Sequence, residues 1–286
     1  MFDTAIFFAI LSLIFGGLNE VVFKRYSGKA RSRGMMISGI GVVWALLLWL
    51  DVGIRGDSIA VSASGMRYAL IAGLMVAIAN ILFLESLRHM EVSLGSTVYR
   101  LNTIAVVVLS IVFLGEQISL MKMAGIVCGV LAVLLLYRHQ QGIGNHIELR
   151  LGLLLVTLGA LGRAIYGVVS KAGLSAGADQ DLLLLVSAFC WIVSGLVYAR
   201  FVEHRYSITR EKIGYSILSG VLVYGIVRSL LTALETGEAS VVITVANLSF
   251  LMALGVATLL KMETLNRRKC LAMILAVSAI GLLTRV

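Results

Sequence analysis

The chain alternates between long apolar blocks and short polar segments along its whole length. Most blocks run for roughly 16 to 23 residues, the length that a helix needs to cross a hydrocarbon layer about 30 Å thick. The expected spans are 4–23, 35–50, 66–87, 92–114 and 120–137 in the first half, and 151–170, 182–199, 212–234, 239–260 and 270–283 in the second. The pattern predicts an all-α membrane protein with ten transmembrane helices.

Composition agrees with a membrane location. Hydrophobic residues make up 59% of the 286 residues and charged residues only 14%, whereas a soluble domain usually carries about 25% charged residues. The only charge before the first apolar block is that of Asp3, and Lys24 and Arg25 follow the block where a cleavage site would need small residues. We therefore expect a retained span and not a signal peptide.

The net charge of +9 raises the question of nucleic-acid binding. The basic residues, however, cluster at the ends of the predicted helices, which is where membrane proteins place them, and we expect no nucleic-acid partner. Sixteen Lys and Arg residues fall in one set of alternate loops and five in the other set or at the termini. Since cationic loops stay cytoplasmic, the bias predicts a plasma (inner) membrane protein with both termini outside.

The second half of the chain repeats the first when the sequence is shifted by 147 residues. Identical polar residues then coincide without a gap: Glu91 with Glu238, Glu116 with Glu263, and Lys122 with Lys269. Each repeat holds five spans, and an odd number forces the second copy to enter the membrane upside down. Equivalent loops carry opposite charge bias, as inversion requires. The prediction is two inverted five-helix repeats, 1–140 and 148–286, joined by the loop 141–147.

Three short motifs have equivalent positions in this frame. Leu114-Gly115-Glu116 closes the fourth span, Lys261-Met262-Glu263 is a degenerate copy after the ninth, and Lys24 and Lys171 each end the first span of a repeat. With these features the chain resembles the drug/metabolite transporter superfamily, EamA type. The resemblance implies a ten-helix fold around a central cavity that opens to alternate sides, and transport without ATP hydrolysis.

The chain departs from this family in two respects. Family members usually place a proline within the fourth and ninth spans, whereas this sequence has no proline, so we expect its 29 glycines to supply the bending. Many relatives also have cytoplasmic termini, whereas the charge bias here predicts the reverse. The direction of transport is left open.

Several polar residues fall at membrane depth, where an ionisable group costs at least a few kcal/mol and marks a pathway or a pair. We predict a cavity lined by Arg100, Arg163, Arg228, Tyr224, Asn80 and Asn247. Arg228 follows Tyr224 by four residues, so the two share a helix face, and Asn247 is the repeat equivalent of Arg100. Because guanidinium groups bind planar oxyanions, three of them favour a ligand with a carboxylate or phosphate.

Three further residues lie toward the cytoplasmic ends of the first and third spans. Glu20 or Glu85, with Asn19 nearby, could hold a substrate ammonium group or exchange a proton. The alternative is that the arginines pair with Glu20 and Glu85, or snorkel, and only fix the packing of the helices. For Glu116 and Glu263 we expect a structural role at helix ends.

Other residues have a structural interpretation. Gly125 and Gly129, matched by Ala272 and Ala276, form small-residue faces that we expect to pack within the chain, a homodimer seam being the alternative. We expect the tryptophans to be interface anchors; they are Trp44, Trp49 and Trp191. The cysteines (Cys128, Cys190, Cys270) and histidines (His89, His139, His146, His204) have no ligand spacing, so we expect no metal and no cofactor.

These features together predict a secondary active transporter, an exporter or exchanger, of small polar metabolites that are anionic or zwitterionic, such as amino acids or organic acids. A flippase for a lipid-linked phosphate or sugar is the alternative with the same fold. An intramembrane enzyme is a remote alternative because no catalytic motif lies at membrane depth. The expected partners are a small-molecule substrate and membrane lipids.

Overall fold

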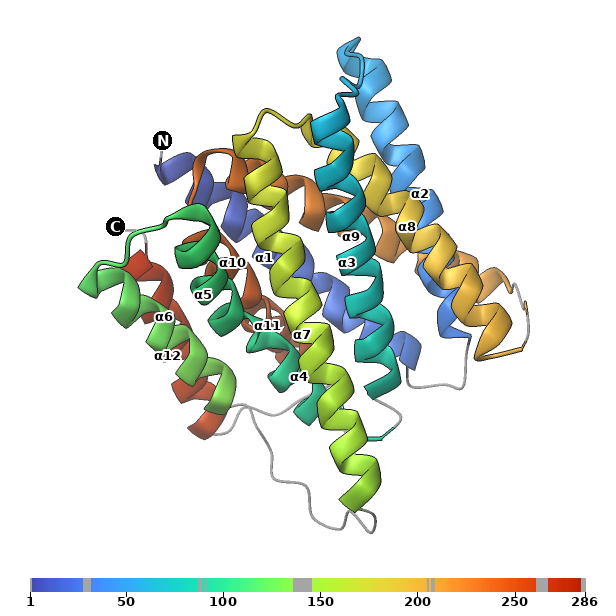
Figure 1. The fold of residues 1–286 in the computed structure, drawn as a ribbon. Helices are drawn as coiled ribbons and strands as arrows, with labels where there is room; N and C mark the ends of the chain where they lie inside the picture. The colour runs from blue at the N-terminus through green and yellow to red at the C-terminus, as the bar shows by residue number, and fades with distance from the viewer. Residues whose placement is uncertain are drawn as a thin grey trace.

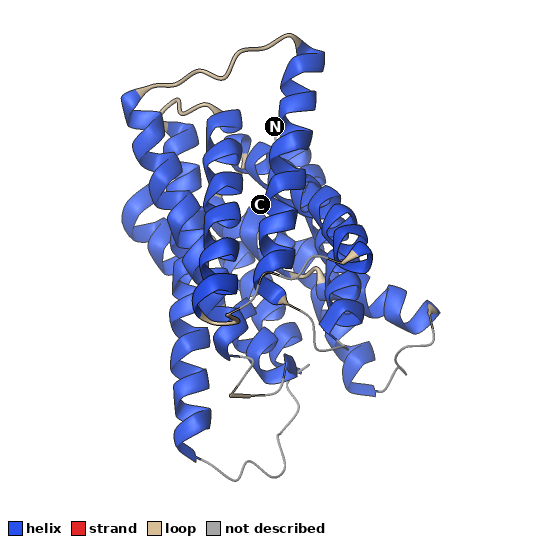
Figure 2. Cartoon of the chain, turned by 90° about the vertical axis from the view of Figure 1, so that its right-hand side faces the viewer, coloured by secondary structure: helices blue, strands red, loops and turns tan. Residues whose placement is uncertain are grey.

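A computed structural model describes residues 2–27, 32–86, 89–90, 92–135, 146–204, 206, 209–260 and 267–283. All the regular structure in these ranges is helical (Figure 2). The first half contains α1 (Phe2–Ser27), α2 (Arg33–Arg55), α3 (Ala63–Ser86), α4 (Val92–Arg100), α5 (Asn102–Leu114) and α6 (Leu120–Leu135). The second half contains α7 (His146–Ser175), α8 (Gln180–Phe201), α9 (Arg210–Thr236), α10 (Ala239–Asn247), α11 (Phe250–Leu259) and α12 (Arg267–Leu283).

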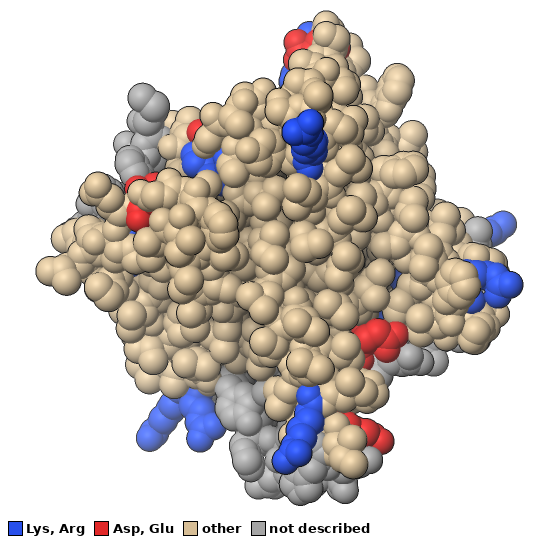
Figure 3. Space-filling view, viewed as in Figure 1, with Lys and Arg blue, Asp and Glu red and all other residues tan. Residues whose placement is uncertain are grey.

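The ten predicted spans are confirmed, with one addition: the fourth and the ninth span each consist of two helices in succession, α4 with α5 and α10 with α11. Eight spans in the described part of the chain are long and apolar enough to cross a membrane, and α6 is a shorter apolar helix. Large apolar side chains such as Phe113 and Phe189 are exposed on the outside. In Figure 3 a broad uncharged area separates the Lys, Arg, Asp and Glu side chains near the margins of the molecule, as expected for a surface that faces lipid.

The packing of the helices is symmetric under exchange of the two halves. The helix pair α3 and α7 packs as extensively as its equivalent, α9 and α1, and α3 with α8 matches α9 with α2. The pairs α2 with α8 and α6 with α12, which each map onto themselves, also pack side by side (Figure 1). This is the pattern of a pseudo-twofold axis. Because each half crosses the membrane five times, the axis lies in the membrane plane and the repeats are inverted.

Two tryptophans mark this axis. Trp44 of α2 and Trp191 of α8 are 147 positions apart, and their rings meet edge to face with centroids 6.0 Å apart. Both are buried, so the expectation that they anchor the chain at the membrane interface is wrong, whereas Trp49 is 72% exposed. The backbones of α2 and α8 approach so closely that a Cβ on Gly195 would lie 2.5 Å from the nitrogen of Ser38. Close approach of this kind requires glycine.

The small-residue faces of α6 and α12 pack against each other within the chain. A Cβ on Gly125 would lie 2.8 Å from the side chain of Leu283, and Ala272 and Ala276 are fully buried. Contacts within the chain therefore cover the small-residue faces for which a homodimer interface was the alternative.

Neither interruption of a span stands at a glycine. The fourth span breaks at Leu101 and the ninth at Leu248 and Ser249, so the breaks have equivalent positions in the two repeats. Tighter i→i+3 bonds replace part of the helical pattern: the Leu101 N–H donates to Val98 at 3.1 Å, and the Leu248 N–H to Val245 at 3.0 Å. The expectation that glycine supplies the bending is therefore wrong at these two points, which are short 3₁₀ turns.

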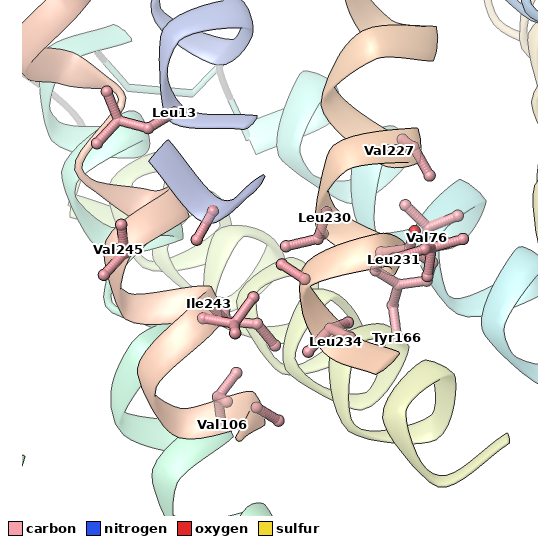
Figure 4. Packing of buried hydrophobic residues seen from close by; sticks show 14 of the residues in the cluster. Leu13, Val76, Val106, Tyr166, Val227, Leu230, Leu231, Leu234, Ile243 and Val245 are labelled. Atoms are coloured by element: carbon pink, nitrogen blue, oxygen red, sulfur yellow. The ribbon is translucent and has the colours of Figure 1, made fainter. Parts of the chain in front are cut away.

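An apolar core surrounds the interrupted helices. Figure 4 shows Val106 of α5 close to Ile243 of α10, and Leu234 of α9 nearby. On the other side of α9, Tyr166 of α7 packs among apolar side chains such as Leu231. The core holds α7 and α9 against the broken spans and so positions the polar residues described next.

Candidate functional site

The breaks in the two interrupted spans meet in the middle of the molecule. The helices α4 and α10, which enter from opposite faces, have nine residues each, about 14 Å at 1.5 Å per residue. Their last residues are Arg100 and Asn247. We define the polar residues gathered here as the break cluster: Glu20, Arg100, Asn102, Thr103, Asn247 and Ser249.

An amide bridges the two breaks directly. The Nδ2 of Asn247 donates to the Oδ1 of Asn102 at 2.5 Å and to the Oγ1 of Thr103 at 2.8 Å. Asn102 and Thr103 are both buried. Thr103 in turn donates to the backbone carbonyl of Arg100, at 3.3 Å. A side chain of the second repeat therefore satisfies buried polar side chains at the interruption in the first.

An ion pair completes the break cluster. The guanidinium of Arg100 pairs with the carboxylate of Glu20 on α1, with side-chain exposures of 15% and 37%. The hydroxyl of Ser249, at the other break, donates to the second carboxylate oxygen of Glu20 at 2.7 Å. The guanidinium also lies 5.5 Å from the centroid of the Phe250 ring. The charge of Arg100 is therefore balanced by Glu20, one of the two carboxylates expected to pair with the arginines if these only fix the packing of the helices.

A second polar group joins α2, α8 and α9 at the end of the molecule that carries the termini. Arg228 of α9 pairs with Asp181 of α8, and Arg55 of α2 reaches the same carboxylate at 2.7 Å. Asp51 of α2 lies 3.4 Å from Arg55 and 3.5 Å from Arg228, and accepts a hydrogen bond from the hydroxyl of Tyr224 at 2.7 Å. We call these five residues the terminal-side network. No bond within the described residues joins it to the break cluster.

The predicted lining residues thus lie in separate places. Arg100 and Asn247 meet in the break cluster, with Glu20, and Arg228 and Tyr224 meet in the terminal-side network. Asn80 donates to a carbonyl of its own helix, that of Val76, at 2.7 Å. Glu85 lies half-buried in the last turn of α3, at the opposite end from the network. Asn19 is buried, and its Oδ1 has no hydrogen-bond partner among the described residues.

Arg163 has no hydrogen bond or ion pair with either group among the described residues. It lies near the middle of α7, half-buried, with its guanidinium carbon 5.9 Å from the centroid of the Tyr166 ring. Among the residues that the structure describes, it forms no ion pair. It is therefore the one predicted arginine whose charge is not balanced by a carboxylate in this part of the chain.

The Leu-Gly-Glu motif has a clear local role. Gly115 ends α5 in the left-handed region, with φ 67°, a conformation that glycine adopts at little cost. The turn directs Glu116 to the other repeat, where its carboxylate accepts from the backbone N–H groups of Ala239 at 2.6 Å and Ser240 at 3.1 Å. Glu116 thus caps the N-terminus of α10, in the structural role expected of it. Glu263 and the rest of its motif, like Glu91, lie outside the described residues.

Two lysines fix helix ends nearby. Lys122, which is buried, bonds to the carboxylate of Glu238 just before α10. Lys171, the lysine that ends the first span of the second repeat, donates to the carbonyl of Leu234 in the last turn of α9, at 2.7 Å. The side chain of Lys24, its repeat equivalent, lies outside the described part.

The described residues contain no group of three or more His, Cys, Asp or Glu side chains placed to hold a metal ion. The three cysteines are free thiols. The chemistry available at the centre of the molecule is therefore that of guanidinium, carboxylate, amide and hydroxyl groups, which bind small polar solutes reversibly.

Six polar residues in these clusters were not predicted as site residues: Asp51, Arg55, Asp181, Asn102, Thr103 and Ser249. Two signals could have found them. The 147-residue shift places Asn102 on Ser249, a polar match directly after the two breaks. Asp51 precedes Arg55 by four residues, which is the spacing of a helical ion pair.

Comparison with known proteins gives one family and one fold. The sequence pattern of the EamA-like transporter family matches residues 3–138 and 150–285. No curated protein matches the sequence. One solved crystal structure superposes with a TM-score of 0.82 over 98% of this chain and 96% of its own, at 14% sequence identity, which shows the fold alone. With both halves matched, the chain belongs to the EamA-like transporter family, part of the drug/metabolite transporter superfamily.

Proposed function

We propose that the chain is a secondary active transporter of small polar metabolites, anionic or zwitterionic, and that the break cluster is its substrate site. The observation that carries the proposal is the meeting of two interrupted spans at mid-membrane, with Glu20, Arg100 and Asn247 gathered around them. Interrupted helices with charged side chains at this depth are costly to a structural bundle and are typical of solute sites in transporters.

The helix ends at the site favour a ligand with charges of both signs. The N-termini of α5 and α11 and the C-termini of α4 and α10 all lie at the breaks. A helix N-terminus attracts anions and a C-terminus attracts cations. Arg100 and Glu20 add a full charge of each sign, so charged and polar groups of a solute can compete for this ion pair.

The inverted repeats support alternating access. Two halves related by an axis in the membrane plane can exchange conformations, which exposes a central site to one side and then the other. On the side of the termini, the terminal-side network ties α9 to α2 through Arg228 and Asp51. We infer that these bonds close that side and break when it opens.

The remaining assignments belong to the same proposal. The charge bias of the loops favours the plasma (inner) membrane with both termini outside. We assign the two repeats to 1–140 and 148–286, with 141–147 between them. We infer an exporter or exchanger in which Glu20 supplies the proton or ammonium site.

Uptake into proteoliposomes tests the function. Purified protein would first be screened by thermal shift against amino acids, organic acids, sugar phosphates and polyamines, and each stabilising compound would be offered as labelled substrate. We expect saturable uptake by the wild type and its loss in Arg100→Ala and Glu20→Gln, with uptake kept by Arg150→Gln, which removes an exposed arginine of α7. Normal uptake by the first two variants would remove the break cluster from the site, and no uptake of any solute would overturn the function.

A further inference from the structure

Arg163 lies near two tyrosines, Tyr99 and Tyr166, whose hydroxyls are buried. The hydroxyl of Tyr99 is shielded from solvent and makes no hydrogen bond among the described residues, whereas the equally shielded hydroxyl of Tyr166 has the side chain of Ser170 within reach. The guanidinium carbon of Arg163 lies 5.9 Å from the centroid of the Tyr166 ring, and Tyr166 as a whole is 2% exposed.

Tyr99 packs against the cluster of Met90 and Val156. Val156 lies seven residues before Arg163 on the same face of α7. Tyr99 is also held by stacking on Phe83, with ring centroids 4.5 Å apart. Buried hydroxyls normally find a partner.

The repeat symmetry shows which way Arg163 faces. Its equivalent in the first repeat is Gly16 of α1, where a Cβ would lie 3.1 Å from the Cβ of Ser249 at the ninth-span break. The pair α5 and α7 packs as α11 and α1 do. The same face of α7 therefore looks toward the fourth-span break, next to Tyr99. Where the first repeat has Gly16 in close contact with the break, the second repeat therefore has the cationic side chain of Arg163.

Of the three arginines predicted at membrane depth, two have carboxylate partners. Arg100 is balanced by Glu20, and Arg228 lies between Asp181 and Asp51. Arg163 has no carboxylate partner in the described ranges. A lone guanidinium at membrane depth is costly unless a ligand or water meets it, and it offers two parallel N–H donors to a planar oxyanion.

We propose that Arg163, with the hydroxyl of Tyr99, binds the carboxylate of the transported solute, and that this solute carries one carboxylate per molecule. A carboxylate matches the single positive charge of Arg163, whereas a phosphomonoester brings about 1.5 to 2 negative charges. The proposal rests on the proposed function and adds the class of substrate to it. Glu20 and Arg100 then contact the remainder of the solute.

Matched ligand pairs test the proposal. The probes are L-amino acids against the corresponding L-amino acid amides, and monocarboxylic acids against their primary amides, with inorganic phosphate and sugar phosphates as a third arm. Binding to protein in detergent is measured by thermal shift and calorimetry. We expect the wild type to prefer carboxylates, and Arg163→Gln to weaken carboxylate binding by about 10- to 100-fold while leaving amide binding unchanged. Arg150→Gln, on the same helix but exposed, serves as the control.

Several results would overturn the proposal. They are an equal response of the wild type to acids and amides across the panel, a preference for phosphates, and an unchanged carboxylate preference in Arg163→Gln. Tyr99→Phe keeps the ring on Phe83 and all charges, so it gives an answer even where Arg163→Gln does not fold. We expect about three- to tenfold weaker carboxylate binding in this variant, and an unchanged affinity would exclude the hydroxyl from the site.

Uptake separates this proposal from the transport function. Saturable uptake of neutral or cationic solutes without any preference for carboxylates would overturn the role of Arg163 and leave a transporter. Absence of uptake for every solute would overturn the transport function itself.

Discussion

Asn247 of α10 donates a hydrogen bond to Asn102 of α5 at 2.5 Å, so that the interrupted spans of the two repeats touch across the pseudo-twofold axis. Asn247 ends one half-helix and Asn102 begins another. The side chain of Asn247 therefore contacts both interruptions, and a substitution of Asn247 tests how the two repeats pack against each other.

Replacing Asn247 with alanine should destabilise the bundle. The change leaves the buried Oδ1 of Asn102 without its donor and removes a bond to Thr103, which together cost about 1 to 2 kcal/mol in a membrane protein. The unfolding midpoint should fall by about 2 to 8 °C. Thermal unfolding in detergent, followed by light scattering or intrinsic fluorescence, measures it.

Asn80→Ala is the matched control, since that amide bonds only to its own helix. It should leave the midpoint within about 1 °C of the wild type. Equal destabilisation by the two variants would argue against a special role of the bridge.

The pair of Glu20 and Arg100 is suited to a double-mutant cycle. Glu20→Gln and Arg100→Met each leave one charge at membrane depth unpaired, and each should cost about 1 to 3 kcal/mol, less than a fully buried pair because Glu20 is 37% exposed. The double variant removes both charges and should lose less than the two single losses added together. Strict additivity would show that the two side chains do not interact.

Breaking the terminal-side network should impair transport more than binding. Arg228→Ala removes one of two cations from Asp181 and frees Asp51, so the side of the termini should close less completely. We expect net uptake to be abolished while the affinity for solute, measured by calorimetry, changes less than about threefold. Arg67→Ala, an exposed arginine on the same side, is the control. Loss of binding in Arg228→Ala would place Arg228 in the substrate site instead.

The Leu-Gly-Glu motif gives a stability prediction. Glu116→Gln weakens the cap on α10 and should cost about 0.5 to 2 kcal/mol. Gly115→Ala forces a Cβ into a backbone with φ 67° and should cost about 1 kcal/mol. Gly214→Ala, in a helix with open space around the site, should instead stabilise by up to about 1 kcal/mol. Chemical denaturation in mixed micelles ranks the three variants.

The orientation can be measured with single cysteines in a chain whose own three are replaced by serine. Ser58→Cys lies in the loop between α2 and α3, and Tyr206→Cys in the loop between α8 and α9; both positions are exposed. With the termini outside, a membrane-impermeant maleimide should label Ser58→Cys in intact cells and Tyr206→Cys only after permeabilisation. The reverse labelling would place the termini in the cytoplasm.

The fold could be predicted because the sequence repeats two long features, apolar blocks of about twenty residues and a unit of 147 residues. Twenty-residue apolar blocks leave little choice in a membrane, and the shift of 147 residues fixed the repeat register well enough to pair Arg100 with Asn247, the last residues of α4 and α10. The interruptions themselves escaped prediction. Each depends on side chains of Asn102, Thr103 and Ser249, which accept or donate across helices, and a single span does not reveal such partners.

The site was predicted in part for a related reason. Hydropathy identifies a charge at membrane depth, such as Arg228, but not its neighbours. Asp181 and Asp51 lie near helix ends in the sequence and were assigned to loops, yet both pair with Arg228 because α2, α8 and α9 converge there. The burial of Trp44 and Trp191 at the axis was not predicted for the same reason, because the two rings meet only when the two repeats pack together.

The absence of proline from the two broken spans has a mechanical consequence. Proline has no backbone N–H to donate, so a kink at proline is permanent. At Leu101 and Leu248 the N–H donor is still present. The N–H of Leu101 is shared between Thr97 and Val98. The N–H of Leu248 donates to Val245, one residue short of the α-helical pattern. Each span can therefore straighten into a continuous helix by exchanging one set of backbone bonds for another, without breaking more than it makes. The two hinges are in this sense reversible, and straightening one while the other stays bent would turn a symmetric bundle into either of two asymmetric forms related by the pseudo-twofold axis.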